Sequence, residues 1–242
     1  AMRRFAEHLR AQGHRVHYMA LNDADNQQEI TANLQVLFQR TGAEEFGYLL
    51  PDEYRLDEQL EHFAANCGLQ VHVADTHHFL TAREELATLF KGKKQYLMER
   101  FYRTMRERPG LLMKGDEPLG GQWNYDHDNR QRTPKGHVPP PPLLFDHDLR
   151  YLHRLVTDAG VKTIGTVDAA HFTWPLDRAE SLVLLRYFCE HLLHRFGTYQ
   201  DAMDPHHWAL YHARISFSMN VKLLHPLEVC EAAVRAHHAD PD

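Results

Sequence analysis

The sequence predicts two parts: an α/β N-terminal domain with a Rossmann-like parallel sheet, followed by an all-α domain. Three observations lead to this fold class. Helical and strand patterns alternate over residues 1–74, as in parallel strands joined by crossover helices. From Phe145 onward the patterns are helical throughout. A run of four prolines, residues 139–142, lies just before this change and predicts a stiff, extended crossing between the two parts.

The α/β part should contain three helices and three strands. Its helices end at Gly13, Gly42 and Gly68, since glycine readily takes the left-handed conformation that closes a helix. On this topology a strand should precede the first helix, so we expect the first strand to be missing and Ala1 to be a truncation point or a cloning scar. The expected elements are a helix over 2–12, a strand over 15–21, a helix over 26–40, a strand over 45–50, a helix over 56–66 and a strand over 69–74.

A basic, loop-rich stretch follows the α/β part. A capping-box pattern at residues 81–84 predicts a short helix, and residues 96–108 predict a second helix with four arginines crowded on one side. The favoured interpretation of these arginines is a solvated helix face, and the alternative is a surface that binds the phosphates along a nucleic-acid backbone. The loop over 120–130, GGQWNYDHDNR, combines large planar and hydrogen-bonding side chains, so we expect packing between two bodies to order it.

The remaining chain should be helical. A helix is expected over 147–159, and Asp177 should cap a long helix that Gly197 follows. Pro226 should open a last helix over 227–237, whereas residues 208–219 are less regular.

The totals exclude several classes of protein. Of the 242 residues, 43% are apolar and 25% are charged, which is typical of a soluble globular protein, and no run approaches a membrane span. The net charge of −6 means that the chain lacks the overall excess of positive charge that indicates a nucleic-acid-binding protein. Three cysteines without a C-x-x-C pair fit a reducing cytoplasm and argue against a disulfide framework. The 20 histidines include no H-E-x-x-H pattern, so no metal site is expected. No nucleotide-binding or hydrolase motif occurs.

One further stretch, residues 211–226, could hold an anion. It places hydroxyls, Arg214 and backbone donors just before helix-forming sequence. From spacing alone, the favoured interpretation is an ordinary helix N-terminus, whose backbone N–H groups are hydrogen-bonded within the chain and bind no anion.

Taken together, these stretches resemble the photolyase/cryptochrome family, and most of all its bacterial photolyase-related branch, the iron-sulfur prokaryotic (6-4) photolyases and cryptochromes. The resemblance covers essentially the whole chain, and the loop over 120–130 is its most specific part. The matching segments are 101–103, 110–113, 120–126, 129–130, 174–175, 178–179 and 199–203. The resemblance implies an α/β antenna-type domain over 1–90, a basic helix and interdomain linker over 91–146, and the start of a helical FAD-binding domain over 147–242.

The resemblance also implies cofactor contacts. Residues 212–216 and 224–226 align with the family's T-S-R-L-S and L-S-P segments, which wrap the phosphates of FAD. Ala213 and His225 stand where serines are usual, and Lys222 replaces a small residue. The implied FAD contacts are Tyr199, Arg214, Ile215 and Ser216, with His212 and Asn220 as further candidates.

The implied function is light-dependent DNA repair, in which reduced FAD passes an electron to a flipped-out (6-4) lesion. A ribityl-lumazine antenna, a [4Fe-4S] cluster, damaged DNA as partner and a monomeric, cytoplasmic protein belong to the same expectation. No catalytic residue is expected in this chain, and its three cysteines match no cluster ligand. We therefore expect a fragment with part of the FAD pocket and no repair activity of its own. The alternatives are a cryptochrome-like blue-light photoreceptor and, from another class, a flavin-free scaffold protein.

Overall fold

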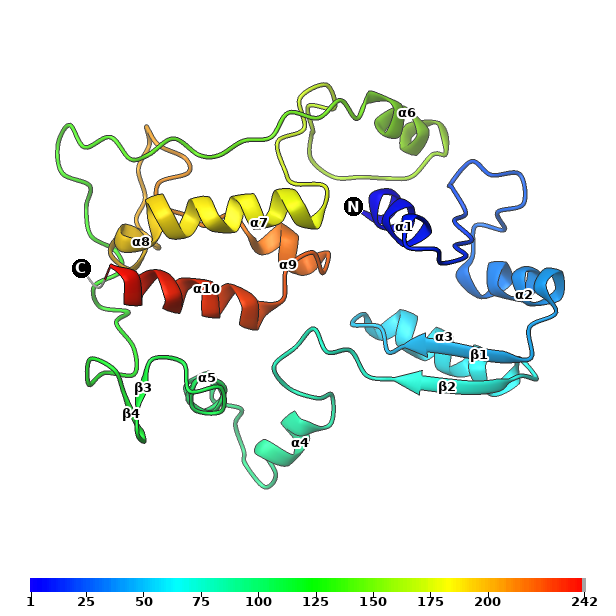
Figure 1. The fold of residues 1–242 in the computed structure, drawn as a ribbon, viewed down its shortest axis with the longest axis horizontal. Coiled ribbons are helices and arrows are strands. Elements are labelled where there is room, and N and C mark those ends of the chain that lie inside the picture. Colours follow the sequence, from blue (N-terminus) through cyan, green and yellow to red (C-terminus); the bar gives the residue numbers. More distant parts are fainter. Residues whose placement is uncertain (241–242) are drawn as a thin grey trace. The chain divides into compact units, whose positions relative to one another are not determined.

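The computed structural model describes residues 1–240, which form two compact units (Figure 1). The sheet unit comprises residues 6–86 and 147–172, and the helical unit comprises residues 1–5, 87–146 and 173–240. A small parallel sheet and many helices fit the expected α/β-plus-helical class. The photolyase-type domain limits at residues 90 and 146 stay a prediction. Within residues 1–240 no helix is both long and apolar enough to cross a membrane.

The sheet unit is built on two parallel strands, β1 (Glu45–Leu49) and β2 (Gln70–Ala74), joined by α3 (Tyr54–Asn66). The ring of Phe46 on β1 lies 5.1 Å from that of Phe38 and 6.0 Å from that of Phe63, so strand and helices share an aromatic core. The sheet unit also contains α2 (Ile30–Thr41), α6 (Arg150–Asp158) and residues 6–11 of α1 (Met2–Ala11).

The strand expected over residues 15–21 is wrong: this segment is irregular, and the sheet of β1 and β2 has two strands. Its backbone groups are engaged by side chains instead of by a neighbouring strand. Arg10 donates to the carbonyl of Val16 at 3.0 Å, and the amide of Ala20 donates to Asp23 at 2.6 Å. An alternating pattern becomes a strand only where a partner strand completes its hydrogen bonds, and local side chains compete for those bonds here.

Helix α2 begins at Ile30, four residues later than expected, because Asn26 holds the preceding turn. The Asn26 side chain donates to the carbonyl of Ala20 at 2.9 Å and accepts from the amide of Gln28 at 2.8 Å. The predicted end at Gly42 is confirmed, since Gly42 adopts the left-handed conformation with φ 64°.

In the helical unit, one long helical run supplies most of the core. It consists of α7 (Arg178–Tyr187), a π-helical turn η1 (Phe188–Leu192) and α8 (Leu193–Tyr199). Helix α8 continues through Gly197, which was expected to follow the helix, and buried Tyr199 closes its last turn. The buried core residues are Leu184, Leu185, Phe188, Leu192, Tyr199, Leu210, Tyr211, Ile215 and Leu224.

Shorter elements complete the chain. The last helix begins at Pro226 as predicted, with the His225 side chain as its cap. The Pro-rich stretch 133–142 contains neither helix nor strand. The short elements are α4 (Glu85–Leu89), α5 (Met98–Glu107), a hairpin of β3 (Met113–Lys114) and β4 (Glu117–Pro118), α9 (Ser216–Asn220) and α10 (Pro226–Ala239).

Asp177 caps α7 as predicted and also binds Arg4. Its carboxylate accepts from the amide of Glu180 at 2.9 Å, and Arg4 donates to it at 2.6 Å. Burial alone would raise the pKa of Asp177, but the amide of Glu180 and the Arg4 guanidinium outweigh burial and lower it. The cap and the ion pair therefore both need the ionised carboxylate.

Asp177→Ala should lower the free energy of unfolding by about 1 to 2 kcal/mol at neutral pH, because it removes a helix cap. Since the folded-state pKa is depressed, this stabilisation is present above the usual aspartate value of about 3.9 and is lost as the pH falls through the folded-state pKa. Urea unfolding at several pH values measures both effects. The exposed Asp126→Ala is the matched control, and an equal loss in the two variants would contradict the cap.

Candidate functional site

The candidate site centres on Arg214, in the turn just before α9. The guanidinium of Arg214 lies over two indole rings, at 4.8 Å from the centroid of Trp174 and 5.0 Å from that of Trp208. Its Nη1 donates to the carbonyl of Leu143 at 2.9 Å. We call Arg214, Trp174, Trp208 and the Leu143 carbonyl the Arg214 cluster. Each indole attracts the cation through its ring face, so the guanidinium is held from two sides.

The charge of Arg214 has no acidic partner. No carboxylate of residues 1–240 forms an ion pair or hydrogen bond with this side chain, and its Nε is buried without a hydrogen-bond partner. Burial lowers the pKa of Arg214, although a guanidinium keeps its proton at any physiological pH. Arg214 is half-buried, and a cation that is partly removed from water without a counter-charge is costly, so the cluster is suited to binding an anion.

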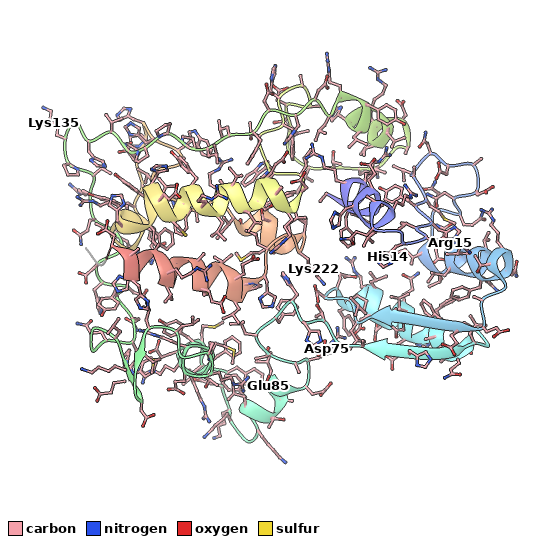
Figure 2. The ribbon with its side chains drawn as sticks, viewed as in Figure 1. His14, Arg15, Asp75, Glu85, Lys135 and Lys222 are labelled. Carbon is pink, nitrogen blue, oxygen red and sulfur yellow. The ribbon has the colours of Figure 1, made fainter. Side chains whose placement is uncertain are left out.

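The backbone of Arg214 itself is also strained. Arg214 has φ 56°, in the left-handed region that residues other than glycine rarely occupy. Leu210 at φ 40° and Lys222 at φ 61° lie close to it in the sequence, and Figure 2 labels Lys222, which lies between α9 and α10. Such conformations cost roughly 1 to 3 kcal/mol each and concentrate at functional sites.

Helix α9 and the segment just before it carry the other residues expected near the phosphates. Ile215 is buried in the core, while Ser216 and Asn220 are exposed. Ser218, which the sequence did not single out, is fully buried, and its hydroxyl has no hydrogen-bond partner. His212 is half-buried.

Tyr199 lies in an aromatic stack within the core. Its ring is 5.4 Å from that of Tyr211, with the two planes inclined by 20°. Tyr211 is itself buried and shares a hydrogen bond of 2.8 Å with Nε2 of His137. Burial raises the pKa of Tyr211, which keeps its phenol protonated. Tyr199 and Ile215 thus belong to one core, and the polar candidates Ser216 and Asn220 lie outside it.

The loop before Trp208 is ordered by Asp204. Its carboxylate accepts from the amide of His206 at 2.7 Å and from the hydroxyl of Thr133 at 2.8 Å. The His206 amide, followed by the Thr133 hydroxyl, lowers the pKa of Asp204 to about 2. Asp204 therefore stays ionised at neutral pH and holds the segment that presents Trp208.

Sequence reasoning missed Trp208, Leu143 and Ser218 as members of this neighbourhood. Leu143 and Trp174 come from distant segments that only tertiary packing brings to Arg214. Trp208 and Ser218 are near it in the sequence, but the stretch over 208–219 has no regular period that would predict which side chains meet. Trp174 was noted as part of a family-like segment without a role. Periodicity and local motifs carry no signal for such a contact.

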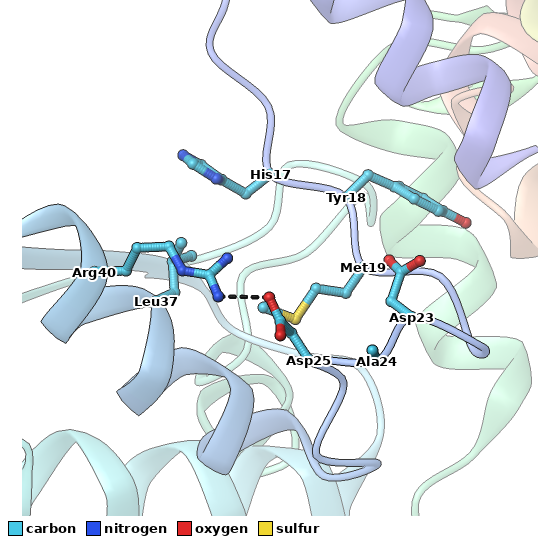
Figure 3. A pocket seen from close by; sticks show the side chains of 8 residues that line it. All are labelled: His17, Tyr18, Met19, Asp23, Ala24, Asp25, Leu37 and Arg40. Atoms are coloured by element: carbon cyan, nitrogen blue, oxygen red, sulfur yellow. Dashed lines mark hydrogen bonds and ion pairs between the residues drawn. The ribbon is translucent and has the colours of Figure 1, made fainter.

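A separate pocket of about 340 Å³ lies in the sheet unit (Figure 3). Arg40 on α2 forms an ion pair with Asp25 at 2.6 Å across it. The pocket contains none of the expected site residues. Nowhere in residues 1–240 are three His, Cys, Asp or Glu side chains grouped to hold a metal ion. The lining residues are His17, Tyr18, Met19, Asp23, Ala24, Asp25, Leu37 and Arg40.

Comparison with known proteins agrees with the resemblance seen in the sequence. A family model described as deoxyribodipyrimidine photo-lyase-related protein matches residues 1–172. The chain is 35% identical over 247 aligned residues to a (6-4) photolyase of Agrobacterium fabrum, covering 98% of this chain and 47% of that protein. The chain belongs to the photolyase-related family.

A second relative is more distant. An uncharacterized protein of Acanthamoeba polyphaga mimivirus is 24% identical over 138 residues, or 55% of this chain and 68% of that protein. The chain spans about half the length of the Agrobacterium photolyase. The matched family region includes the loop over 120–130, whereas Arg214 and α9 lie beyond it and within the part of the sequence expected to contact FAD.

Tyr211→Phe should lower the free energy of unfolding by about 1 kcal/mol, because the ring stack survives but the buried hydrogen bond to His137 is lost. Thermal or urea unfolding measures the change. Tyr96→Phe, which removes a hydroxyl from a ring that is 77% exposed, should leave stability unchanged. A loss for Tyr211→Phe no larger than that of the control would show that the hydrogen bond contributes nothing.

Proposed function

We propose that this photolyase-related chain contributes part of the FAD site of a light-dependent DNA-repair protein of the (6-4) photolyase kind. The observation that carries the proposal is the Arg214 guanidinium, which is held by two indoles and has no acidic partner among residues 1–240. The 35% identity to a protein named a (6-4) photolyase supports the same conclusion. Damaged DNA would be the substrate.

The residues present fit the phosphate end of a flavin dinucleotide. Arg214 offers a charged donor group whose Nε lacks a partner, and an anionic oxygen would supply both the missing acceptor and the missing counter-charge. The buried hydroxyl of Ser218, four residues after Arg214, also has no hydrogen-bond partner among the described residues. A pyrophosphate is the chemical group that these donors best match.

Each residue of the Arg214 cluster would then have a distinct task. Arg214 binds the phosphates, and the Leu143 carbonyl orients its guanidinium. Trp174 and Trp208 shield the cation from water, which strengthens its attraction to an anion. Buried Ile215 anchors the start of α9, so that exposed Ser216 and Asn220 are presented on a fixed backbone. The bound flavin supplies the light-driven electron transfer to the lesion.

Other parts of the proposal rest on family resemblance. Residues 1–90 would belong to an antenna-type domain that binds a ribityl-lumazine, and the protein would also hold a [4Fe-4S] cluster. The thiols of Cys67, Cys189 and Cys230 are not assigned to that cluster. Burial raises the pKa of Cys189 and of Cys230, which disfavours the thiolate form that binds metal. We place the protein in the cytoplasm as a monomer on the same grounds.

A repair assay tests the proposed function. The natural polypeptide that carries this chain is purified and its flavin reduced, and it is then mixed with DNA containing one (6-4) lesion under blue light. Loss of the lesion, with none in the dark, is the expected result. Bound flavin with unchanged lesions under light would contradict repair and favour a photoreceptor. A purified protein without flavin absorption would contradict the cofactor and favour a scaffold protein.

A further inference from the structure

The strongest concentration of positive charge in the chain lies outside the Arg214 cluster, in residues 91–114. This basic segment contains eight Lys or Arg residues and two Glu residues, an excess of six positive charges, in a chain whose net charge is −6. It runs from the end of α4 through α5 to β3 (Figure 1). Positive charge is therefore gathered locally on a protein that is acidic as a whole.

Most of these cations are unpaired and exposed. Five of them form no ion pair with any carboxylate of residues 1–240, and every residue from 91 to 100 is exposed. A solvated basic surface commonly carries interspersed acidic partners, and here one such pair, Arg103 with Glu99, is present. The five cations are Lys91, Lys93, Lys94, Arg100 and Lys114.

The remaining arginines of α5 fix the helix in place. Arg106 donates to the carbonyls of Leu111 at 3.0 Å and Leu112 at 2.9 Å. The guanidinium groups of Arg103 and Arg106 lie 4.9 and 5.7 Å from the ring centroid of Trp123. Met105 is buried. One side of α5 is thus anchored by packing and hydrogen bonds, which holds Arg100 on a fixed helix. The other unpaired cations flank this helix: Lys91, Lys93 and Lys94 lie in the segment just before it, and Lys114 lies on β3.

The dimensions and the side chains of this surface favour a nucleic acid over a membrane. Ten residues of helix span about 15 Å, the length of about four phosphates along one DNA strand at roughly 3.4 Å each. An interfacial membrane helix needs a long continuous apolar face, whereas α5 has ten residues and its apolar Met105 is already packed. The exposed apolar side chains of this segment are Leu97 and Met98, at the start of the helix, with the rings of Tyr96 and Tyr102. Tyr96, which is 77% exposed, adds a flat ring beside the lysines that could pack against sugar or base.

We propose that the basic segment binds the phosphate backbone of duplex DNA independently of sequence. The choice of DNA as the partner rests on the proposed function. The surface itself is separate from the Arg214 cluster and has no role in the repair reaction. It would add general affinity for DNA, while recognition of a lesion belongs elsewhere in the protein.

The test compares a triple variant, Lys91→Gln/Lys93→Gln/Lys94→Gln, with the natural polypeptide that carries this chain. Binding to an undamaged DNA duplex is measured by fluorescence anisotropy at salt concentrations from 50 to 200 mM. Each phosphate contact contributes about 0.9 to the slope of log K against log salt, so three lost contacts should flatten the slope by about 2.7. Over this range the natural protein should lose about 40-fold more affinity than the variant.

A matched control removes three exposed cations from the sheet unit, Arg15→Gln/Arg154→Gln/Lys162→Gln (Arg15 is labelled in Figure 2). It has the same net charge as the first variant and should keep the natural slope. Equal slopes of log K against log salt in the two variants would overturn the proposal. A triple lysine variant that no longer binds phosphatidylserine vesicles but binds DNA like the natural protein would also overturn it. Flavin content and light-driven repair, measured in parallel, report separately on the proposed function.

Discussion

The Arg214 guanidinium is positioned by groups from three separate segments, and the account of this chain depends on that arrangement. Trp174 precedes α7, Trp208 lies in the loop ordered by Asp204, and the Leu143 carbonyl ends the Pro-rich stretch. None of these groups carries a negative charge. The packing of the helical unit therefore leaves a half-buried cation without a counter-charge among residues 1–240, an arrangement suited to binding an anion. The proposal of an anionic cofactor is built on that arrangement.

The sequence anticipated those features that depend on neighbouring residues. Asp177, Gly42 and Pro226 mark helix boundaries through local capping chemistry, and all three are confirmed. The failures are features that depend on distant partners. Residues 15–21 alternate like a strand, yet Arg10 and Asp23 engage their backbone and no neighbouring strand pairs with them. Local pattern cannot reveal which competing hydrogen bond is formed.

The candidate site shows the same division. Arg214, Ile215 and Ser216 were expected to contact FAD because their motif matches a family segment, and the structure places them in one turn. Leu143 and Trp174, which lie 71 and 40 residues before Arg214, and Trp208, which lies 6 residues before it, give Arg214 its environment. Their roles follow from packing alone. Tyr199, expected at the cofactor, lies in the core stack beside Tyr211.

A flavin-binding comparison tests the central claim most directly. The affinities of the natural polypeptide for FAD and for riboflavin, which lacks phosphate, are measured by fluorescence quenching and compared with those of Arg214→Met. Loss of a charge-assisted hydrogen bond should weaken FAD binding by about tenfold to a hundredfold and leave riboflavin binding unchanged. Arg186→Met, an exposed position on α7, is the control. Equal losses for both flavins, or none for FAD, would contradict a phosphate site at Arg214.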